Sequence, residues 1–201
     1  MSSKTFIPIV LIVLLWEGCG TGTDVPNCPY VYQQQQLKNV SSTPTPLGKS
    51  RTNAQDGYAP NFEWRRSDGT LDSLSAHQGT VILLNFWATW CGPCVSEMPA
   101  IQSVADEMKD SVLVIGIDED HVCDPFPTVN NFIQGKGIRY QIVVDSNYEL
   151  YYRYFPNVRE NPSLYAIPQS FFIDRNGSIR YAEAGVGDKA AFETFIRNSS
   201  K

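Results

Sequence analysis

The chain has 201 residues, 42% of them apolar, and a formal net charge of −5 at pH 7. This length is enough for one domain of ordinary size with additional segments. No basic block stands out that could neutralise phosphates, so the composition argues against a nucleic-acid partner. The five cysteines, at positions 19, 28, 91, 94 and 123, are too few for a disulfide scaffold and are interpreted one by one.

Residues 1–19 resemble a bacterial export signal. Lys4 supplies a positive charge, and residues 6–16 form an uncharged apolar run. This run is too short to cross a bilayer, which takes about 20 apolar residues. Small glycines flank Cys19, as in the cleavage box of bacterial lipoproteins, and this resemblance implies cleavage before Cys19 and lipid attachment to it. An uncleaved short anchor and ordinary secretion are the alternatives, and each version places the rest of the chain outside the cytoplasm.

Residues 20–57 are predicted to form a flexible tether, and residues 58–201 the folded domain. The tether contains four consecutive glutamines and a Ser/Thr/Pro cluster, with little periodic apolar pattern. Such a segment would let the domain reach partners from a membrane surface. In an oxidising compartment Cys28 could pair with Cys123, or Cys123 could be a free buried thiol, since spacing alone does not fix connectivity.

The domain begins with a predicted β-hairpin and a buried strand. Residues 61–64 alternate like a strand, residues 67–70 have the composition of a tight turn, and residues 71–74 follow as a second strand. We expect this hairpin to pack beside the main sheet. The run 81–86 is apolar on both faces, as expected of a buried parallel strand.

Two cysteines with C-x-x-C spacing, Cys91 and Cys94, follow this strand. Apolar side chains then recur at steps of three and four, which predicts a helix. At its N-terminus, free N–H groups and the macrodipole favour a thiolate on Cys91, and Cys94 can attack a mixed disulfide formed there. We expect an exposed Cys91 and a buried Cys94, with Gly92 and Pro93 in the first turn. Half a zinc site and two incidental thiols are the rival interpretations, but the sequence has no second C-x-x-C pair to complete a zinc site.

The segment Asn85–Cys94, N-F-W-A-T-W-C-G-P-C, continued by E-M-P, resembles the active-site segment of the TlpA/ResA-type thiol–disulfide oxidoreductases. These are membrane-attached members of the thioredoxin-like superfamily (redoxin/AhpC-TSA group). The resemblance implies an α/β, thioredoxin-like fold with a central mixed sheet flanked by helices. It also implies an N-terminal β-hairpin extension and an insertion before a cis-proline loop. It implies an enzyme with no cofactor beyond the redox-active Cys91–Cys94 pair, and no metal.

The middle of the domain continues the alternation of strands and helices. An acidic loop at 118–127 contains His121 and Cys123, which invites a metal hypothesis, but the spacing matches no ligand pattern. Residues 155–166 look like an irregular insertion, which is a candidate specificity element or mere decoration. The other predicted elements here are a strand at 112–117, a helix at 128–135, a strand at 141–144 and a helix at 147–154.

Ile167 and Pro168 open the next predicted strand. By resemblance Pro168 is the cis-proline that faces the dithiol, and the backbone of Ile167 pairs with an extended substrate strand. From the residues alone, Pro168 is a proline at the first position of a strand. A hairpin then turns at Asn176-Gly177, joining strands near 171–173 and 179–184, and a last helix capped by Asp188 runs to about residue 197.

One departure concerns proton transfer. Cytosolic thioredoxins have a buried aspartate where this chain has Asn85, and an amide cannot take the proton of the second thiol. Glu97 and Glu119 are the candidate proton relays, with water as the alternative, although a glutamate at the position of Glu97 is more often a solvated helix residue. Trp90, like Trp87, is a candidate for packing and docking around the thiol.

The resemblance implies partners as well. These are cysteine-containing envelope proteins, such as apocytochromes c in cytochrome c maturation, and a membrane thiol-reducing transporter as electron source. A peroxidase of the peroxiredoxin type is one alternative, but Leu84 and Ala88 replace the Pro and Thr of its P-x-x-x-T-x-x-C pattern. A copper-delivery protein using Cys91, Cys94 and His121 is another, although that class has C-x-x-x-C spacing.

Overall fold

This computed structural model describes residues 57–66, 68–119, 126–145 and 148–201. The predicted export signal, almost all of the tether, and Cys19, Cys28, His121 and Cys123 lie outside these ranges. Within them, no helix is both long enough and apolar enough to cross a bilayer.

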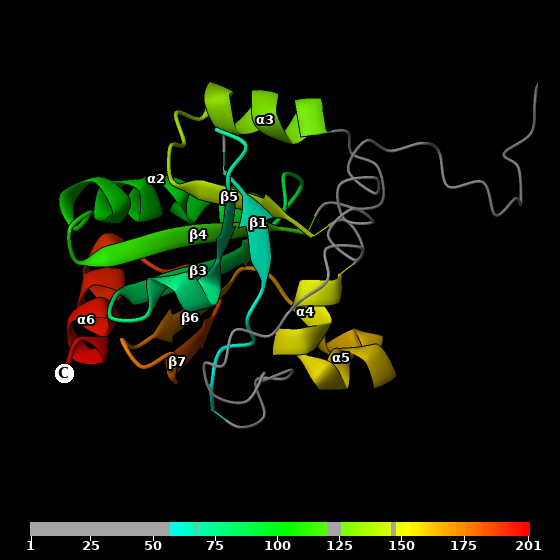
Figure 1. Cartoon of the computed structure of the whole chain (residues 1–201). Helices are drawn as coiled ribbons and strands as arrows, with labels where there is room; N and C mark the ends of the chain where they lie inside the picture. Colours follow the sequence, from blue (N-terminus) through cyan, green and yellow to red (C-terminus); the bar gives the residue numbers. More distant parts are fainter. Residues whose placement is uncertain (1–56, 67, 120–125, 146–147) are drawn as a thin grey trace, which may run out of the picture.

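A five-stranded mixed sheet, with strand order β5-β4-β3-β6-β7, forms the centre of the domain (Figure 1). The first half is parallel: β3 (Val81–Trp87) pairs with β4 (Val112–Asp118), and β4 pairs with β5 (Gln141–Val144). The second half is antiparallel, because β6 (Gln169–Ile173) pairs with β3, and β7 (Ile179–Ala184) with β6. The mixed sheet and its predicted strands are therefore confirmed.

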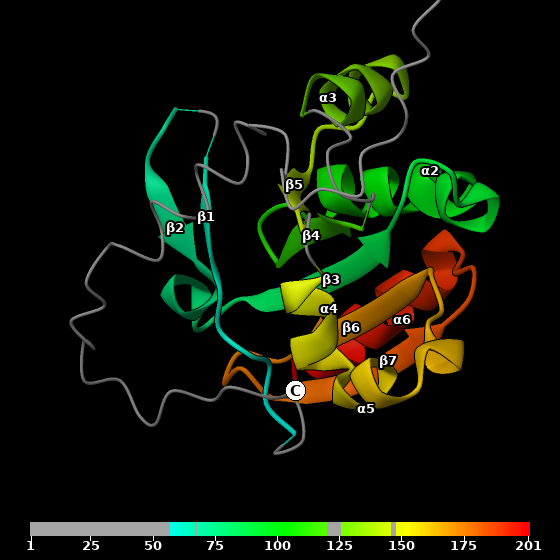
Figure 2. The same cartoon turned by 90° about the vertical axis from the view of Figure 1, so that its right-hand side faces the viewer.

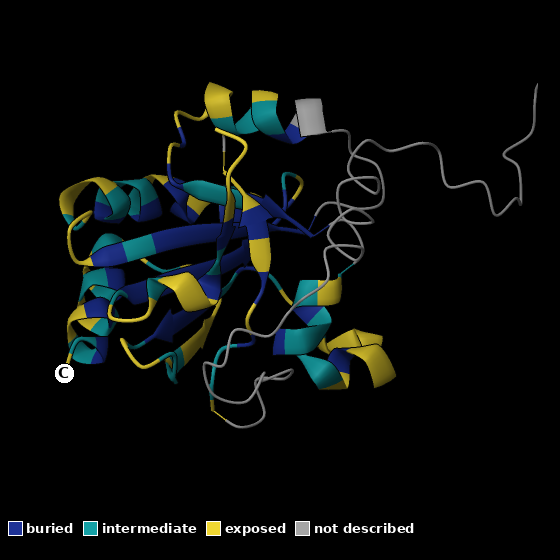
Figure 3. Cartoon of the chain, viewed as in Figure 1, coloured by how far each residue is buried: buried dark blue, intermediate teal, exposed yellow. Residues whose placement is uncertain are grey.

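The central strand β3 is buried along its whole length, as its apolar sequence predicts (Figure 3). Successive residues point to opposite faces. Val81, Leu83 and Trp87 join a core cluster with α2 (Gly92–Glu107), α3 (Phe126–Gly135) and α6 (Lys189–Ser199). The alternate residues Ile82, Leu84 and Phe86 join a second cluster with the N-terminal hairpin and α4 (Glu149–Tyr154). Figure 2 shows the helices and the hairpin that cover the two faces of the sheet.

The predicted N-terminal hairpin is present as β1 (Glu63–Arg65) and β2 (Leu71–Ser73). The second strand is shorter than expected because Ser73 caps a short 3₁₀ helix, η2 (Leu74–His77), by accepting a hydrogen bond from the N–H of Ala76. The hairpin packs on the sheet through the buried side chains of Phe62 and Trp64.

The insertion at 155–166 is helical, so the expectation of irregular chain was wrong. It contains α5 (Pro156–Glu160) and the 3₁₀ helix η3 (Pro162–Leu164). Each helix begins with a proline, where the missing N–H costs little and the fixed φ suits a helix. Asn161 adds a cap by accepting a hydrogen bond from the N–H of Ser163. Pro156 and Pro162 therefore begin helices.

Candidate active site

The cysteine pair lies between the carboxyl end of β3 and the start of α2, where Cys91 and Cys94 form a disulfide. Cys91 is the N-cap residue of α2, and its Sγ accepts a hydrogen bond from the N–H of Cys94 at 3.2 Å. Its carbonyl accepts a second one from the N–H of Val95 at 3.0 Å. In the reduced protein a negative charge on the Cys91 sulfur would face the unpaired N–H groups of the helix. This geometry favours Cys91 over Cys94 as the thiolate.

The exposure expected from the sequence is found for Cys94 but not for Cys91. Cys94 is 1% exposed, as expected, but Cys91 is only 5% exposed in this disulfide form, so the expectation of an exposed Cys91 was wrong. The reason is the loop before β6, whose Ile167 carbonyl oxygen lies 3.8 Å from the Cys91 sulfur. Gly92 and Pro93, which follow Cys91 in the chain, are exposed.

The loop that covers the disulfide contains the expected cis-proline. The peptide bond from Ile167 to Pro168 is cis, as the resemblance implied. The carbonyl of Pro168 accepts a hydrogen bond from the N–H of Gly185 at 3.0 Å, which joins the loop to the segment after β7. The loop is therefore fixed from two sides, by the sheet and by this segment.

The two tryptophans have different roles. Trp87 is completely buried and stacks on Phe132, with ring centroids 5.9 Å apart, so it belongs to the core. Gly116 makes room for it, since a Cβ there would lie 2.9 Å from the indole nitrogen. Trp90 is 57% exposed next to Cys91, and of the two only Trp90 is available to a partner.

Glu97 is buried in a polar network behind the disulfide, with only 1% of its surface exposed. Its Oε1 accepts a hydrogen bond from the Asn85 side-chain amide at 2.9 Å, and its Oε2 accepts one from the N–H of Gly187 at 2.9 Å. The Asn85 amide also donates to the Ser170 hydroxyl at 3.1 Å. The interpretation of Glu97 as a solvated helix residue was wrong, because the amide at position 85 and the loop before α6 give its carboxylate partners inside the fold.

Burial raises the pKa of Glu97, and the hydrogen bonds from Gly187 and Asn85 offset this only in part. Glu97 follows Cys94 by three residues on α2, so the two side chains lie on the same side of the helix. A carboxyl group with a raised pKa, one turn from the buried thiol, is a better proton acceptor than an ordinary carboxylate.

A second group of buried acids lies at the carboxyl ends of β4 and β5. Glu119 is completely buried, and its pKa is well above the usual range because of burial, then the charges of Asp145 and Asp118. The pKa of Asp145 is raised to about 6 by burial, although its carboxylate accepts the N–H of Tyr151 at the start of α4. Among the described residues, neither carboxylate oxygen of Glu119 has a hydrogen-bond partner, and the protonated form is favoured because it removes the repulsion by Asp145 and Asp118.

Within the described ranges, no three His, Cys, Asp or Glu side chains are arranged to hold a metal ion. The buried carboxyl groups of Glu97, Glu119 and Asp145 are better understood as proton-binding groups.

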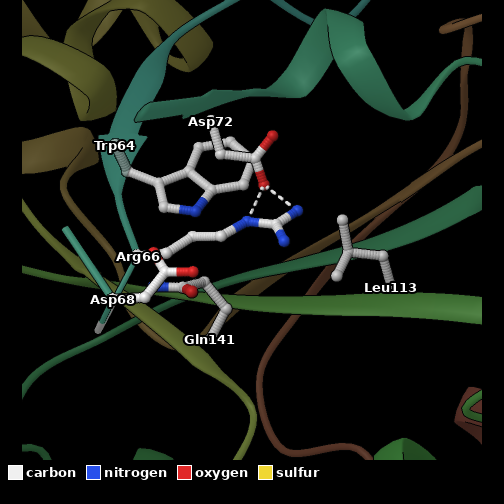
Figure 4. A pocket seen from close by; sticks show the side chains of 6 residues that line it. All are labelled: Trp64, Arg66, Asp68, Asp72, Leu113 and Gln141. Carbon is white, nitrogen blue, oxygen red and sulfur yellow. Dashed lines mark hydrogen bonds and ion pairs between the residues drawn. The ribbon is translucent and has the colours of Figure 1, made fainter. Parts of the chain in front are cut away.

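A pocket of about 370 Å³ lies under the N-terminal hairpin (Figure 4). Asp72 accepts hydrogen bonds from Arg66 at 2.8 Å and from His77 at 2.9 Å, which closes one side of it. The pocket also touches Leu113 and Gln141, near the starts of β4 and β5. Because the disulfide follows the opposite end of the parallel strand β3, this pocket is separate from the active site.

Sequence reasoning missed four residues of the site: Asp145, Tyr151, Ser170 and Gly187. Asp145 had a signal, since an aspartate between a strand and a helix is a common N-cap. Ser170 and Gly187 had none, because their partners Asn85 and Glu97 are 85 and 90 positions away.

The strand–dithiol–helix arrangement with a facing cis-proline defines a thioredoxin-like thiol–disulfide oxidoreductase. A model of the AhpC/TSA family matches residues 56–182, and the chain belongs to this family. Thioredoxin-like protein YneN of Bacillus subtilis is 27% identical over 146 residues, covering 72% of this chain and 81% of that protein. Thiol-disulfide oxidoreductase ResA of Bacillus cereus is 28% identical over 140 residues, covering 69% and 75%.

Solved structures agree with the fold. StoA from Bacillus subtilis superposes with a TM-score of 0.55 at 26% identity, covering 69% of this chain and 98% of StoA. A thiol:disulfide interchange protein of the thioredoxin family from Chlorobium tepidum gives 0.57 at 27% identity, covering 75% and 98%. The expected resemblance to ResA-type proteins, the thioredoxin-like fold and the enzyme class are thereby confirmed.

The buried acid pair predicts how stability depends on pH. The folded state raises the pKa of Glu119 above its unfolded value of about 4.3. The proton that Glu119 binds therefore adds fully to the free energy of unfolding below that pH, and this contribution is lost as the pH rises through the folded pKa. Glu119→Gln removes this dependence. We expect its free energy of unfolding, relative to that of the native protein, to increase from pH 4.5 to pH 8 in urea titrations.

The exposed Glu63 on β1 provides the matched control. Glu63→Gln should follow the pH profile of the native protein. If Glu119→Gln also followed it, Glu119 would not bind its proton more tightly in the folded state.

Proposed function

We propose that this protein exchanges electrons with disulfides of cysteine-containing proteins in the cell envelope, through Cys91 and Cys94. The observation that carries the proposal is the position of the Cys91 sulfur, which caps α2 and accepts the N–H of Cys94. The names of ResA and of the interchange protein from Chlorobium tepidum support this chemistry.

The exchange takes two steps. The Cys91 thiolate attacks one sulfur of the partner's disulfide, a Cys91–partner disulfide forms, and the partner's other sulfur leaves as a thiolate and takes a proton. Deprotonated Cys94 then attacks the Cys91 sulfur, the Cys91–Cys94 disulfide forms, and the first partner sulfur leaves. Two electrons pass from the dithiol to the partner, and a thiol donor must reduce the enzyme again.

The residues around the sulfur would position the partner. The exposed Trp90, Gly92 and Pro93 form one side of the approach. On the other side, Ile167 has a backbone carbonyl next to the Cys91 sulfur and is followed by cis-Pro168. Backbone pairing of an extended partner with Ile167 would bring its disulfide to Cys91.

Glu97 is the better of the two candidate proton relays. It lies one turn from Cys94, it is buried, and its pKa is raised. Glu119 instead donates its N–H to the carbonyl of Trp87, and its pKa depends on the charges of Asp145 and Asp118. We therefore assign to Glu97 the removal of the Cys94 proton, the role that the amide of Asn85 cannot fill.

The location and partners complete the proposal. Lipid attachment at Cys19 would hold the domain on the extracytoplasmic side of a membrane, with residues 20–57 as a spacer. Its partners there would be cysteine-containing proteins such as apocytochromes c, and a membrane thiol-reducing transporter would supply electrons. The N-terminal sequence and the resemblance to membrane-attached oxidoreductases support this part.

The first test uses variants of each cysteine. Cys91→Ser should abolish reduction of insulin disulfides, because it removes the attacking sulfur. Cys94→Ser should still attack, and should accumulate mixed disulfides that appear as higher bands on non-reducing gels. Insulin reduction by Cys91→Ser at the native rate would exclude the proposal. Peroxide consumption and copper content, measured on the same native sample, separate the peroxidase and copper-delivery alternatives.

The second test concerns Glu97. Glu97→Gln preserves the shape and removes the proton acceptor, so we expect resolution of a preformed mixed disulfide to slow by roughly 10²-fold at pH 7. Its pH profile should lose the step due to Glu97, whereas attack by Cys91 should keep its rate. Glu107→Gln, an exposed position on the same helix, is the matched control. An unchanged profile in Glu97→Gln would assign the proton to water instead.

A further inference from the structure

Exposed apolar side chains gather around the disulfide. Among the described residues, four large apolar side chains are exposed: Leu71, Trp90, Leu164 and Val186. Only Leu71 lies elsewhere, on β2 of the N-terminal hairpin. The other three belong to the three segments that meet at the cysteine pair, which is the pattern expected of a surface that binds a partner.

Two of these side chains, Trp90 and Val186, lie on segments that adjoin the active site or hydrogen-bond to it. Trp90 precedes Cys91 and is 57% exposed. Val186 is 58% exposed and lies between two glycines with fixed positions. The N–H of Gly185 bonds to the Pro168 carbonyl, and the N–H of Gly187 bonds to Glu97.

The third, Leu164, comes from the insertion. It ends η3, is 52% exposed, and precedes Ile167 by three residues. Three residues of chain span at most about 10 Å. Because the Ile167 carbonyl lies 3.8 Å from the Cys91 sulfur, the insertion places an exposed apolar side chain on the segment that leads directly to the dithiol.

A double hydrogen bond fixes the end of the insertion. The Tyr151 hydroxyl donates to the carbonyl of Ala166 at 3.0 Å and accepts the N–H of the same residue at 3.0 Å. The ring of Tyr165 packs on that of Tyr151, with centroids 4.7 Å apart. Since Tyr151 is fully buried on α4, the segment that carries Leu164 is held before any partner arrives, which lowers the entropy cost of binding.

We propose that Leu164, together with Trp90 and Val186, forms an apolar rim that selects partner proteins with an apolar side chain two to four residues from the reacting cysteine. The inference rests on the proposed disulfide exchange and adds its substrate preference. A partner strand paired with Ile167 advances about 3.3 Å per residue, so roughly three residues separate its cysteine from the position over Leu164. Continuity with the dithiol favours this occupant over a lipid surface or a second copy of the chain.

The test measures single turnovers of the full chain, reduced beforehand with dithiothreitol. The substrates are two extended peptides, each with one cysteine joined by a disulfide to the chromogenic thiol 2-nitro-5-thiobenzoate. They differ only at the position three residues from this cysteine, which is Leu in one peptide and Asn in the other. We expect the native protein to prefer the Leu peptide. Leu164→Ser should raise the half-saturating concentration of that peptide roughly tenfold. Its rate with the Asn peptide, and its rate with the small disulfide of the same thiol, should not change.

Two further variants sharpen the result. Leu71→Ser removes a similarly exposed leucine outside the site and should behave like the native protein, and Leu164→Met should retain the preference. The proposed apolar rim would be overturned if the native protein used both peptides equally. It would also be overturned if Leu164→Ser slowed the reactions of both peptides and of the small disulfide alike. Either result would leave the exchange chemistry intact. A native protein that reduces not even the small disulfide would refute the proposed function itself.

Discussion

One hydrogen bond organises the site: the N–H of Cys94 donates to the sulfur of Cys91 at 3.2 Å. It exists because the buried strand β3 ends at Trp87 and the chain turns within a few residues into α2, whose N-cap is Cys91. The same N–H groups that would otherwise lack partners at the start of a helix then stabilise a charged sulfur. Fold and chemistry therefore depend on the same four residues, Cys91 to Cys94.

The buried polar groups behind the dithiol also link packing to chemistry. Buried carboxylates are costly, and Glu97 has hydrogen-bond partners from two other parts of the chain, Asn85 on β3 and Gly187 before α6. These partners fix its position without fully neutralising the effect of burial on its pKa. Such a group is poised to exchange protons and also connects the sheet to the loop that packs beside the active site.

Much of this was predictable because its signals are local. The run from Val81 to Phe86, the C-x-x-C pair, Asn176-Gly177 and the cap Asp188 each predict their own element, and the structure has them where expected. The insertion was not predictable in the same way, since Pro156 can either break or begin a helix. Nor was the cover over Cys91, which comes from a residue 76 positions away. Local patterns determine elements, whereas burial depends on which elements meet.

The most direct test of this account is the pH dependence of alkylation of the reduced protein by iodoacetamide, followed separately at Cys91 and Cys94 by mass spectrometry of the digested chain. The account predicts that Cys91 reacts with a midpoint well below the ordinary thiol value of about 8.5, while Cys94 stays almost unreactive at neutral pH. A midpoint for Cys91 at or above that value, or equal reactivity of the two cysteines, would contradict it.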